Sequence, residues 1–195
     1  MIRLFTALCK IYLKELSEKQ RFLAATEEFS HLGGACPKCG AKGKLSAHGD
    51  YGRGLLSYEG GQIVDADLRA SRLYCSSCGS THALLPDVVV PYSPYSLMFM
   101  LAALIAYYER AMAVEKICAH FGIAVSTLYD WKDRIALHKD LMLGLLISGK
   151  APALGFLRGL IGSRRLSDTL RRFYRMHKFS FMQRRSAPAT RSRPP

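Results

Sequence analysis

The chain has 195 residues, 49% of them hydrophobic and 22% charged, and a formal net charge of +13. This composition supports a buried core and excludes a wholly disordered or fibrous chain. The positive charge predicts an anionic partner, most often nucleic acid and less often a membrane surface. Residues 149–195 contain 12 Lys and Arg against one acid, whereas residues 1–148 contain 16 against 14. We therefore expect the last quarter of the chain to dominate contacts with that partner.

The longest apolar run, residues 97–108, has 12 residues, and a membrane span needs about 20. This run predicts a buried helix instead. The first ten residues contain neither a long apolar region nor a small-residue cleavage site of the kind found in secretory signals. We expect a cytoplasmic, nucleoid-associated protein without membrane contact, in which thiols stay reduced.

The first half of the chain divides into two segments. Residues 1–30 have apolar residues mostly three or four positions apart and predict an amphipathic helix. Residues 31–92 are rich in glycine and contain short β-type runs. Two of these runs flank Glu59-Gly60-Gly61, which predicts a β-hairpin.

The second half also divides into two segments. Residues 93–148 return to a helical pattern. Residues 149–195 predict two short helices, near residues 154–161 and 167–177. The Arg-, Ser- and Pro-rich end that follows them is expected to be disordered on its own.

The strongest chemical signal is a pair of CxxC motifs, Cys36 with Cys39 and Cys75 with Cys78, each followed by a glycine. Two such turns supply four thiolates, which suits a closed tetrahedral zinc site. The predicted ribbon around them is too small to be stable by apolar burial alone, and metal binding would supply the missing free energy. Iron in the same ligand set, two redox pairs and unliganded thiols are the alternatives.

The other cysteines and two nearby histidines are not expected to bind metal. Cys9 and Cys118 lie in helical patterns and are expected to be buried apolar residues. His48 and His82 lie near the ribbon, where we expect hydrogen bonding or surface exposure, because four cysteines already complete a metal site.

Residues 114–131 carry a second signal, the pattern of a helix-turn-helix. Cys118 stands where a small residue lets two helices cross closely, and Gly122 stands at the turn. Leu128 and Trp131 give the second helix an inward face. The apolar run before this unit would complete a three-helix core, with the second helix lying in the major groove.

The DNA contacts expected of that helix involve base edges near its N-terminal end and phosphates beside it. Residues 114–135 have no net charge, so phosphate neutralisation must come from elsewhere. The predicted DNA-binding residues are Ala124, Val125, Ser126, Thr127, Tyr129, Asp130, Lys132 and Arg134.

Arginines of the C-terminal segment can supply phosphate contacts, because guanidinium groups suit phosphate and minor-groove binding. The alternatives are a solvated basic surface or a tail that binds a partner protein. The predicted phosphate-contacting residues are Arg164, Arg165, Arg171, Arg172, Arg175, Arg184 and Arg185.

Residues 31–137 resemble the N-terminal DNA-binding half of insertion-sequence transposases, and the short zinc-ribbon and helix-turn-helix proteins of bacterial mobile elements. The resemblance is carried by CPKCG, the Gly-rich hairpin, RLYCSSCGSTHALLP and FGIAVSTLYDW. It implies a bacterial DNA-binding protein whose four ribbon cysteines hold zinc and whose residues 124–131 read DNA. Such transposases continue into a domain with three metal-holding carboxylates, but only Asp140 and Asp168 follow residue 137 here.

We therefore predict an α+β, mainly α, fold with a small four-cysteine zinc ribbon, a helix-turn-helix three-helix domain and a basic helical or disordered C-terminus. The predicted boundaries are 1–30, 31–92, 93–148 and 149–195. The predicted function is sequence-specific binding of double-stranded DNA without catalysis, by a transposase-like or transposon-associated protein. Such a protein would either regulate an element or recognise DNA for a separate transposase or recombinase subunit. The alternatives are an RNA-binding or protein-interaction module, and a nuclease or recombinase subunit.

Overall fold

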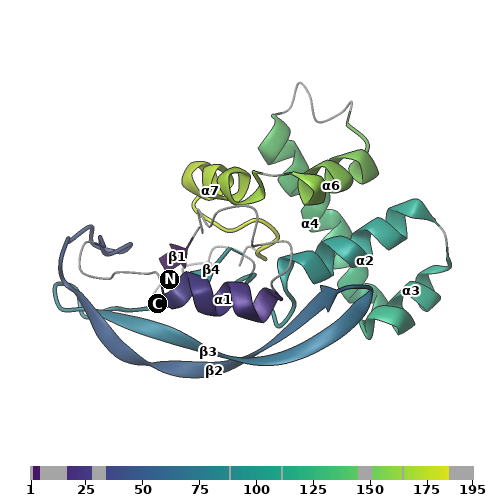
Figure 1. The fold of residues 1–195 in the computed structure, drawn as a ribbon. Helices are drawn as coiled ribbons and strands as arrows, with labels where there is room; N and C mark the ends of the chain where they lie inside the picture. The colour runs from purple at the N-terminus through teal and green to yellow at the C-terminus, as the bar shows by residue number, and fades with distance from the viewer. Residues whose placement is uncertain are drawn as a thin grey trace, which may run out of the picture.

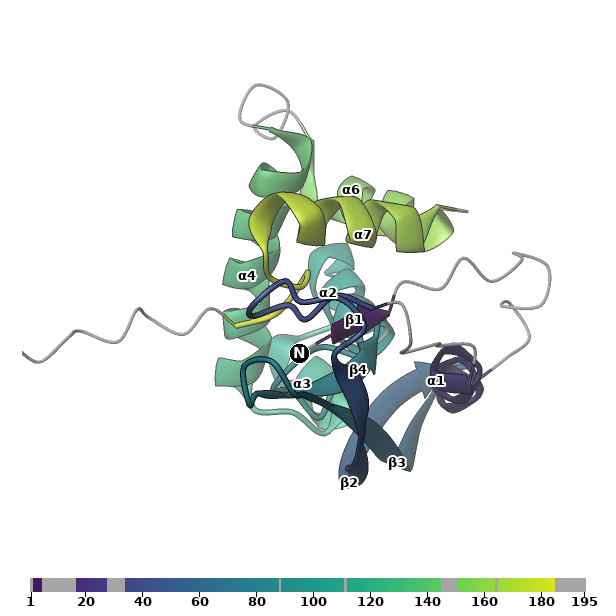
Figure 2. The ribbon, with the colours of Figure 1, turned by 90° about the vertical axis from the view of Figure 1, so that its left-hand side faces the viewer.

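The computed structural model describes residues 2–4, 17–27, 34–87, 89–110, 112–144, 151–163 and 165–184. Figures 1 and 2 show a long curved hairpin along one side of the molecule and helices α6 and α7 on the opposite side, with α2 between them. The strands are β1 (Ile2–Leu4), β2 (Leu45–Glu59), β3 (Gln62–Cys75) and β4 (Thr81–Pro86). The helices are α1 (Glu18–Glu27), α2 (Leu97–Glu109), α3 (Val114–Phe121), α4 (Val125–Leu143), α6 (Ala153–Gly162) and α7 (Leu166–His177).

The hairpin of β2 and β3 turns where the sequence predicts it. Glu59 pairs with Gln62 across the turn, and Gly60 and Gly61 have φ of 58° and 85°. Positive φ at both central residues is what a two-residue hairpin turn with native twist requires. The pairing continues to Leu45 and Cys75, so the two strands have 15 and 14 residues and are far longer than the predicted runs.

The sheet has the strand order β1-β4-β3-β2. Strands β2, β3 and β4 are antiparallel, and β1 adds to β4 in parallel. Helix α1 packs on this sheet, where Phe22 is fully buried against Leu55, Leu68 and Val89. The sheet therefore has a small core of its own in addition to the cysteine cluster.

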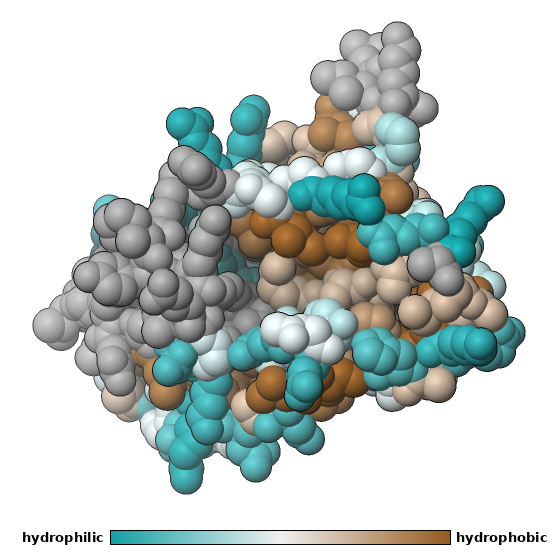
Figure 3. All heavy atoms as spheres, turned by 45° about the vertical axis from the view of Figure 1, so that its right-hand side comes forward, coloured by the Kyte–Doolittle hydropathy of each residue, from teal (hydrophilic) through white to brown (hydrophobic). Residues whose placement is uncertain are grey.

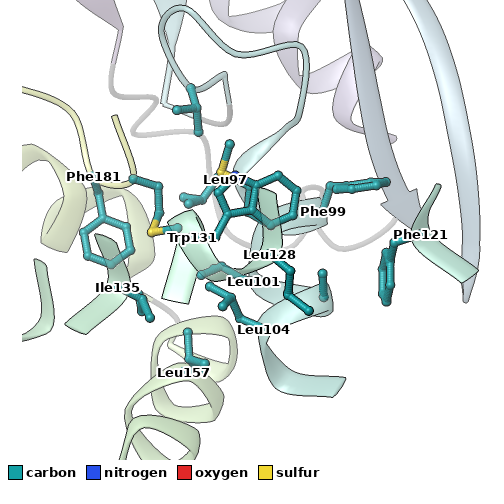
Figure 4. Packing of buried hydrophobic residues seen from close by; sticks show 14 of the residues in the cluster. Leu97, Phe99, Leu101, Leu104, Phe121, Leu128, Trp131, Ile135, Leu157 and Phe181 are labelled. Carbon is teal, nitrogen blue, oxygen red and sulfur yellow. The ribbon is translucent and has the colours of Figure 1, made fainter. Parts of the chain in front are cut away.

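The largest core lies among the helices (Figure 4). Helix α2 is apolar along most of its length and is surrounded by α3, α4 and α6, as its composition predicts for a buried helix. Trp131 of α4 is 1% exposed and meets the rings of Tyr95 and Phe99 edge-on, with centroids 5.0 and 6.1 Å away. Edge-to-face contacts of this kind add to the gain from burial.

The C-terminal helices belong to the same core. Leu157 of α6 and Phe173 of α7 are buried together with the residues of α2 and α4. After α7 the chain returns to α4, and the two polar backbone atoms of Met182 are both bound there. Its N–H donates to Nδ1 of His138 at 2.9 Å, and its carbonyl accepts from Nη1 of Arg134 at 2.9 Å.

This arrangement corrects the predicted fold class. A mixture of helix and strand is present, but the order of a small four-cysteine zinc ribbon followed by a self-contained helix-turn-helix three-helix domain is wrong. A three-stranded antiparallel sheet over residues 45–86 comes first, and five helices follow it in the described part of the chain. The physical reason is that residues 97–143 do not close a core alone. They bury apolar side chains of α6, α7 and residues 181–182, which were predicted to be a basic appendage.

The N-terminal prediction also changes. Within residues 1–30, predicted as one amphipathic helix, the described residues form a short strand at Ile2–Leu4 and a helix only at Glu18–Glu27. The two short helices predicted after residue 149 are confirmed as α6 and α7. The end predicted to be disordered lies outside the described residues from residue 185 onward.

Figure 3 shows apolar side chains gathered in a band across one face, with hydrophilic side chains above and below it. Part of the apolar surface of α2 stays accessible, since Met98, Ala102 and Ile105 are only partly buried. No helix in the described ranges is both long enough and apolar enough to cross a bilayer.

Candidate functional site

The four predicted metal-ligating cysteines come together at one end of the sheet. Their sulfur atoms all lie within 4.8 Å of one another. The Sγ atoms of Cys36 and Cys78 are 3.7 Å apart, and those of Cys39 and Cys75 are 3.8 Å apart. A tetrahedral zinc site with Zn–S bonds of about 2.3 Å separates its sulfurs by about 3.8 Å. The predicted four-cysteine cluster is confirmed, and its spacing suits a tetrahedral metal ion.

The two CxxC turns have the same backbone design. The N–H of Gly40 donates to the carbonyl of Cys36 at 2.8 Å, and that of Gly79 donates to Cys75 at 2.9 Å. Both glycines have positive φ, 76° and 66°, which residues with a side chain rarely adopt. The glycine after each motif therefore lets the loop close around the sulfurs, as the sequence indicates.

The sheet fixes the two turns relative to each other. Cys75 is the last residue of β3, and the N–H of Ser76 donates to the carbonyl of Lys44 at 3.0 Å. Lys38 reaches across from the first turn to the second, donating from Nζ to Oγ of Ser80 at 2.8 Å. The long separation between the motifs in sequence is thus closed by the β2–β3 hairpin.

His82 supports the cluster from β4. Its Nε2 lies 3.3 Å from Sγ of Cys36, and the side chain is buried. Burial lowers the pKa of His82, and the positive charge of Lys38 lowers it further. A neutral imidazole with its proton on Nε2 would donate to the sulfur and orient it, as groups around metal ligands commonly do. The hydrogen-bonding role predicted for His82 is therefore consistent with its position, whereas His48 is exposed.

Backbone and hydroxyl donors act on individual sulfurs. The hydroxyl and N–H of Ser80 lower the pKa of Cys78 to about 6. Burial raises the pKa of Cys36, but the N–H groups of Cys39 and Lys38 outweigh it, and the net shift is downward. For Cys39, the N–H of Ala41 lowers the pKa, but burial and the neighbouring sulfurs raise it to about 11. The cluster thus contains thiols that ionise early and one that stays protonated without a cation, which a bound metal would deprotonate.

Three of the predicted DNA-binding residues at the start of α4, Val125, Ser126 and Tyr129, are exposed, as is the cap residue Ala124. Ala124 is the N-terminal cap residue, and Ser126 beside it is exposed. Val125 and Tyr129 are 41% and 39% exposed, large values for apolar and aromatic side chains. Thr127 is half-buried.

The remaining predicted residues on α4 make contacts within the protein. Nζ of Lys132 lies 5.1 Å from the ring centroid of Tyr129. Arg134 forms an ion pair with Asp130 one turn earlier and also binds the carbonyl of Met182. Its side chain is only 15% exposed, so the guanidinium of Arg134 is largely committed to holding the C-terminal segment on α4.

The predicted phosphate-contacting arginines lie on and around α7. Arg165, Arg172 and Arg175 are exposed, and Arg184 is exposed after the helix. Arg171 is half-buried and lies 4.0 Å from Asp168. Arg164 and Arg185 lie outside the described residues. Lys178 is also exposed, and it ends α7 with φ of 62°.

Two features were missed from the sequence. One is the pair of hydrogen bonds that Arg134 and His138 form with the backbone of Met182, which no local sequence pattern indicates. The other is an open pocket of about 420 Å³ between β2 and the loop before α2, lined by Tyr51, Arg53, Gly54, Tyr92, Ser93 and Pro94. The sequence of this loop indicates only that a helix follows it, and nothing in it indicates a pocket.

Comparison with known proteins gives one match. No curated protein and no solved structure matches the chain. A family model described as a domain of unknown function, DUF6431, matches residues 36–136. This range begins at the first cysteine of the cluster and ends within α4, and it covers more than half of the 195 residues. The chain therefore belongs to the DUF6431 family.

Proposed function

We propose that this chain is a non-enzymatic protein that binds double-stranded DNA, with phosphate contacts from α7 and base contacts from the start of α4. The observation that carries the proposal is the basic face of α7. Leu170 and Phe173 are 5% and 2% exposed and fix the helix in the core, while Arg172 and Arg175 point to solvent. The core fixes the backbone that carries these arginines, and the planar guanidinium loses less entropy per hydrogen bond to phosphate than a lysine does.

The charges around α7 support this proposal. Residues 165–178 contain five Lys and Arg and one acid, Asp168. Arg165, Arg172 and Arg175 are spaced by seven and three residues, which places them on one side of an α-helix. Three exposed cations on one side of a helix suit a polyanion such as a nucleic-acid backbone better than a single anionic group.

The start of α4 supplies the second part of the proposal. Ser126 offers a hydroxyl and Tyr129 a ring and hydroxyl at an exposed helix N-terminus, where backbone N–H groups also favour anions. Asp130 and Arg134 bind each other, so we assign base contacts to Ser126 and Tyr129 and a thymine-methyl contact to Val125.

We propose that zinc occupies the four-cysteine cluster in a structural role. Four thiolate ligands fill a tetrahedral ion and leave no position for water or substrate. Zinc would hold the cysteine end of the sheet together, where few apolar residues are buried. The resemblance to mobile-element proteins adds the proposal that the DNA is an element end and that a separate subunit supplies catalysis.

The first experiment measures how salt weakens the binding of zinc-loaded protein to a short duplex by fluorescence anisotropy. Each lost phosphate contact reduces the slope of log K against log salt by about 0.9. The double variant Arg172→Gln with Arg175→Gln should therefore lower the slope by up to about 1.8. Arg69→Gln is the matched control, because Arg69 is an exposed arginine on the sheet, 3.0 Å from Asp50. Equal slopes in the two variants would reject the assignment to α7.

Point substitutions are needed here, because removing the C-terminal segment would also remove Leu157, Leu170 and Phe173 from the core. The second experiment selects bound duplexes from a random DNA pool. An enriched motif that Ser126→Ala or Tyr129→Leu relaxes would support base contacts from α4. Stronger binding to RNA, or no binding to nucleic acid, would reject the proposal in favour of the RNA-binding or protein-interaction alternative.

A further inference from the structure

An exposed tyrosine stands at the mouth of the pocket between β2 and the loop that precedes α2. Tyr92 is 89% exposed and has φ of 59°. The left-handed backbone region is unfavourable for a residue with a bulky side chain, and a tyrosine this exposed gains nothing from burial. The backbone strain persists only because the surrounding loop enforces it, and such positions concentrate at binding sites.

The loop that carries Tyr92 is held firmly on both sides. Nη2 of Arg53 donates to the carbonyl of Ser93 at 2.5 Å and to that of Val90 at 3.5 Å. Beyond them, the carbonyl of Pro94 accepts from the N–H of Leu56 at 2.7 Å. The ring of Tyr92 is therefore presented outward by a preorganised loop, which lowers the entropy cost of binding a ligand.

The pocket beside this ring combines aromatic and cationic walls. It has a volume of about 420 Å³, and its lining includes Tyr51, Arg53 and Gly54 of β2. The size lies within the range of about 300–1,000 Å³ usual for small-ligand sites.

Arg53 brings a positive charge to the lining of this pocket, while its Nη2 holds the loop carbonyls of Val90 and Ser93. Among the described residues, no carboxylate forms an ion pair with Arg53. Its Nε is buried, so Nη1 is the donor left to meet a ligand. Arg53 pairs with Leu68 in the sheet and shares its face, whereas Asp67 pairs with Gly54 and lies on the other face. An arginine without a counter-ion beside two tyrosines favours a ligand that is both planar and anionic.

We propose that this pocket binds a single unpaired nucleotide, with its base stacked on Tyr92 and its phosphate toward Arg53. Bases stack on tyrosine without sequence preference, and guanidinium groups bind phosphate. The inference deepens the proposed function, on which it rests for the presence of nucleic acid. On this inference, the protein binds DNA that carries an unpaired segment, such as a frayed or processed end, in addition to duplex.

The test uses a short single strand of DNA with one 2-aminopurine, whose fluorescence is quenched when it stacks. Wild-type protein and Tyr92→Phe should quench it, because both present an aromatic ring. Tyr92→Leu should abolish the quenching and weaken binding of the single strand about tenfold. Leu137→Ala is the control for loss of an exposed apolar side chain, since Leu137 is 48% exposed on α4.

The outcomes separate this inference from the proposed function. Duplex binding should be the same for wild type and Tyr92→Leu, because Tyr92 is not among the proposed duplex contacts. Quenching that Tyr92→Leu leaves unchanged, or no quenching by wild type, would overturn the inference. Quenching that depends on Tyr92 in a protein that binds no duplex would reject the duplex proposal and leave the nucleotide site standing.

Discussion

The cysteine end of the sheet and the helical core are stabilised in different ways. The helical core buries 20 residues in one cluster, whereas the cluster around the cysteines contains five, two of which are themselves cysteines. At about 1.5–3 kcal/mol for each buried aliphatic or aromatic side chain, burial contributes far more stabilisation to the helical core than to the cysteine end. The comparison predicts that the cysteine end depends on a bound metal ion for its fold, whereas the helical core does not.

Metal removal should separate the two regions most strongly. A chelator, or Cys75→Ser, should unfold the cysteine end of the sheet, because structural zinc supplies about 10–16 kcal/mol of binding free energy in small domains. Hydrogen exchange measures the effect: amide protection should fall at Leu45, Leu73 and Leu84 and persist in α2 and α4. Cys118→Ala is the control, since Cys118 is buried among the helices and lies outside the cluster. Unchanged protection at Leu73 under chelation would contradict the comparison.

The second prediction tests whether α6 belongs to the helical core. Leu157 is fully buried against α2 and α4, so Leu157→Ala should lower the free energy of unfolding by about 2–5 kcal/mol. Urea denaturation measures this loss, and metal stoichiometry should not change. Leu137→Ala, at an exposed position, should stay within about 0.5 kcal/mol of wild type. A loss for Leu157→Ala as small as that of the control would show that α6 is an appendage.

The features predicted from sequence are those that short segments specify. The CxxC spacing and the glycine after each motif locate the four-cysteine cluster. Each half of the cluster is specified by five consecutive residues. The hairpin turn follows from Gly60-Gly61 for the same reason. Helices α2, α6 and α7 follow from apolar runs and periodicity that few other structures accommodate.

The features that were missed depend on residues far apart in the sequence. The first ten residues of β2 contain Gly49, Gly52 and Gly54, and most of them are exposed, so no apolar alternation indicates a strand. Pairing with β3 forms it nevertheless. The return of Met182 to α4 depends on Arg134 and His138, which precede it by 48 and 44 residues. Without these contacts, the basic composition after residue 149 indicates a tail rather than part of the core.

The smallest effect concerns that return of the chain to α4. Nδ1 of His138 accepts the N–H of Met182, and both residues are buried, at 1% and 0% exposure. The imidazole also contacts the rings of Phe173, Phe179 and Phe181, with centroids 5.2 to 5.5 Å away. His138→Phe should keep the aromatic packing but leave a buried N–H without its acceptor, which costs about 1–3 kcal/mol.

Urea denaturation of His138→Phe and His138→Asn distinguishes the hydrogen bond from the packing. An asparagine places its Oδ1 close to the position of Nδ1, so it should retain the acceptor while losing most of the ring contacts. If the hydrogen bond dominates, His138→Phe is the less stable variant, and the amide of Met182 loses protection only there. If His138→Asn is the less stable, the aromatic contacts hold the C-terminal segment. In that case apolar burial alone extends the helical core into residues 179–182. The difference in apolar burial between the helical core and the cysteine end would then be larger.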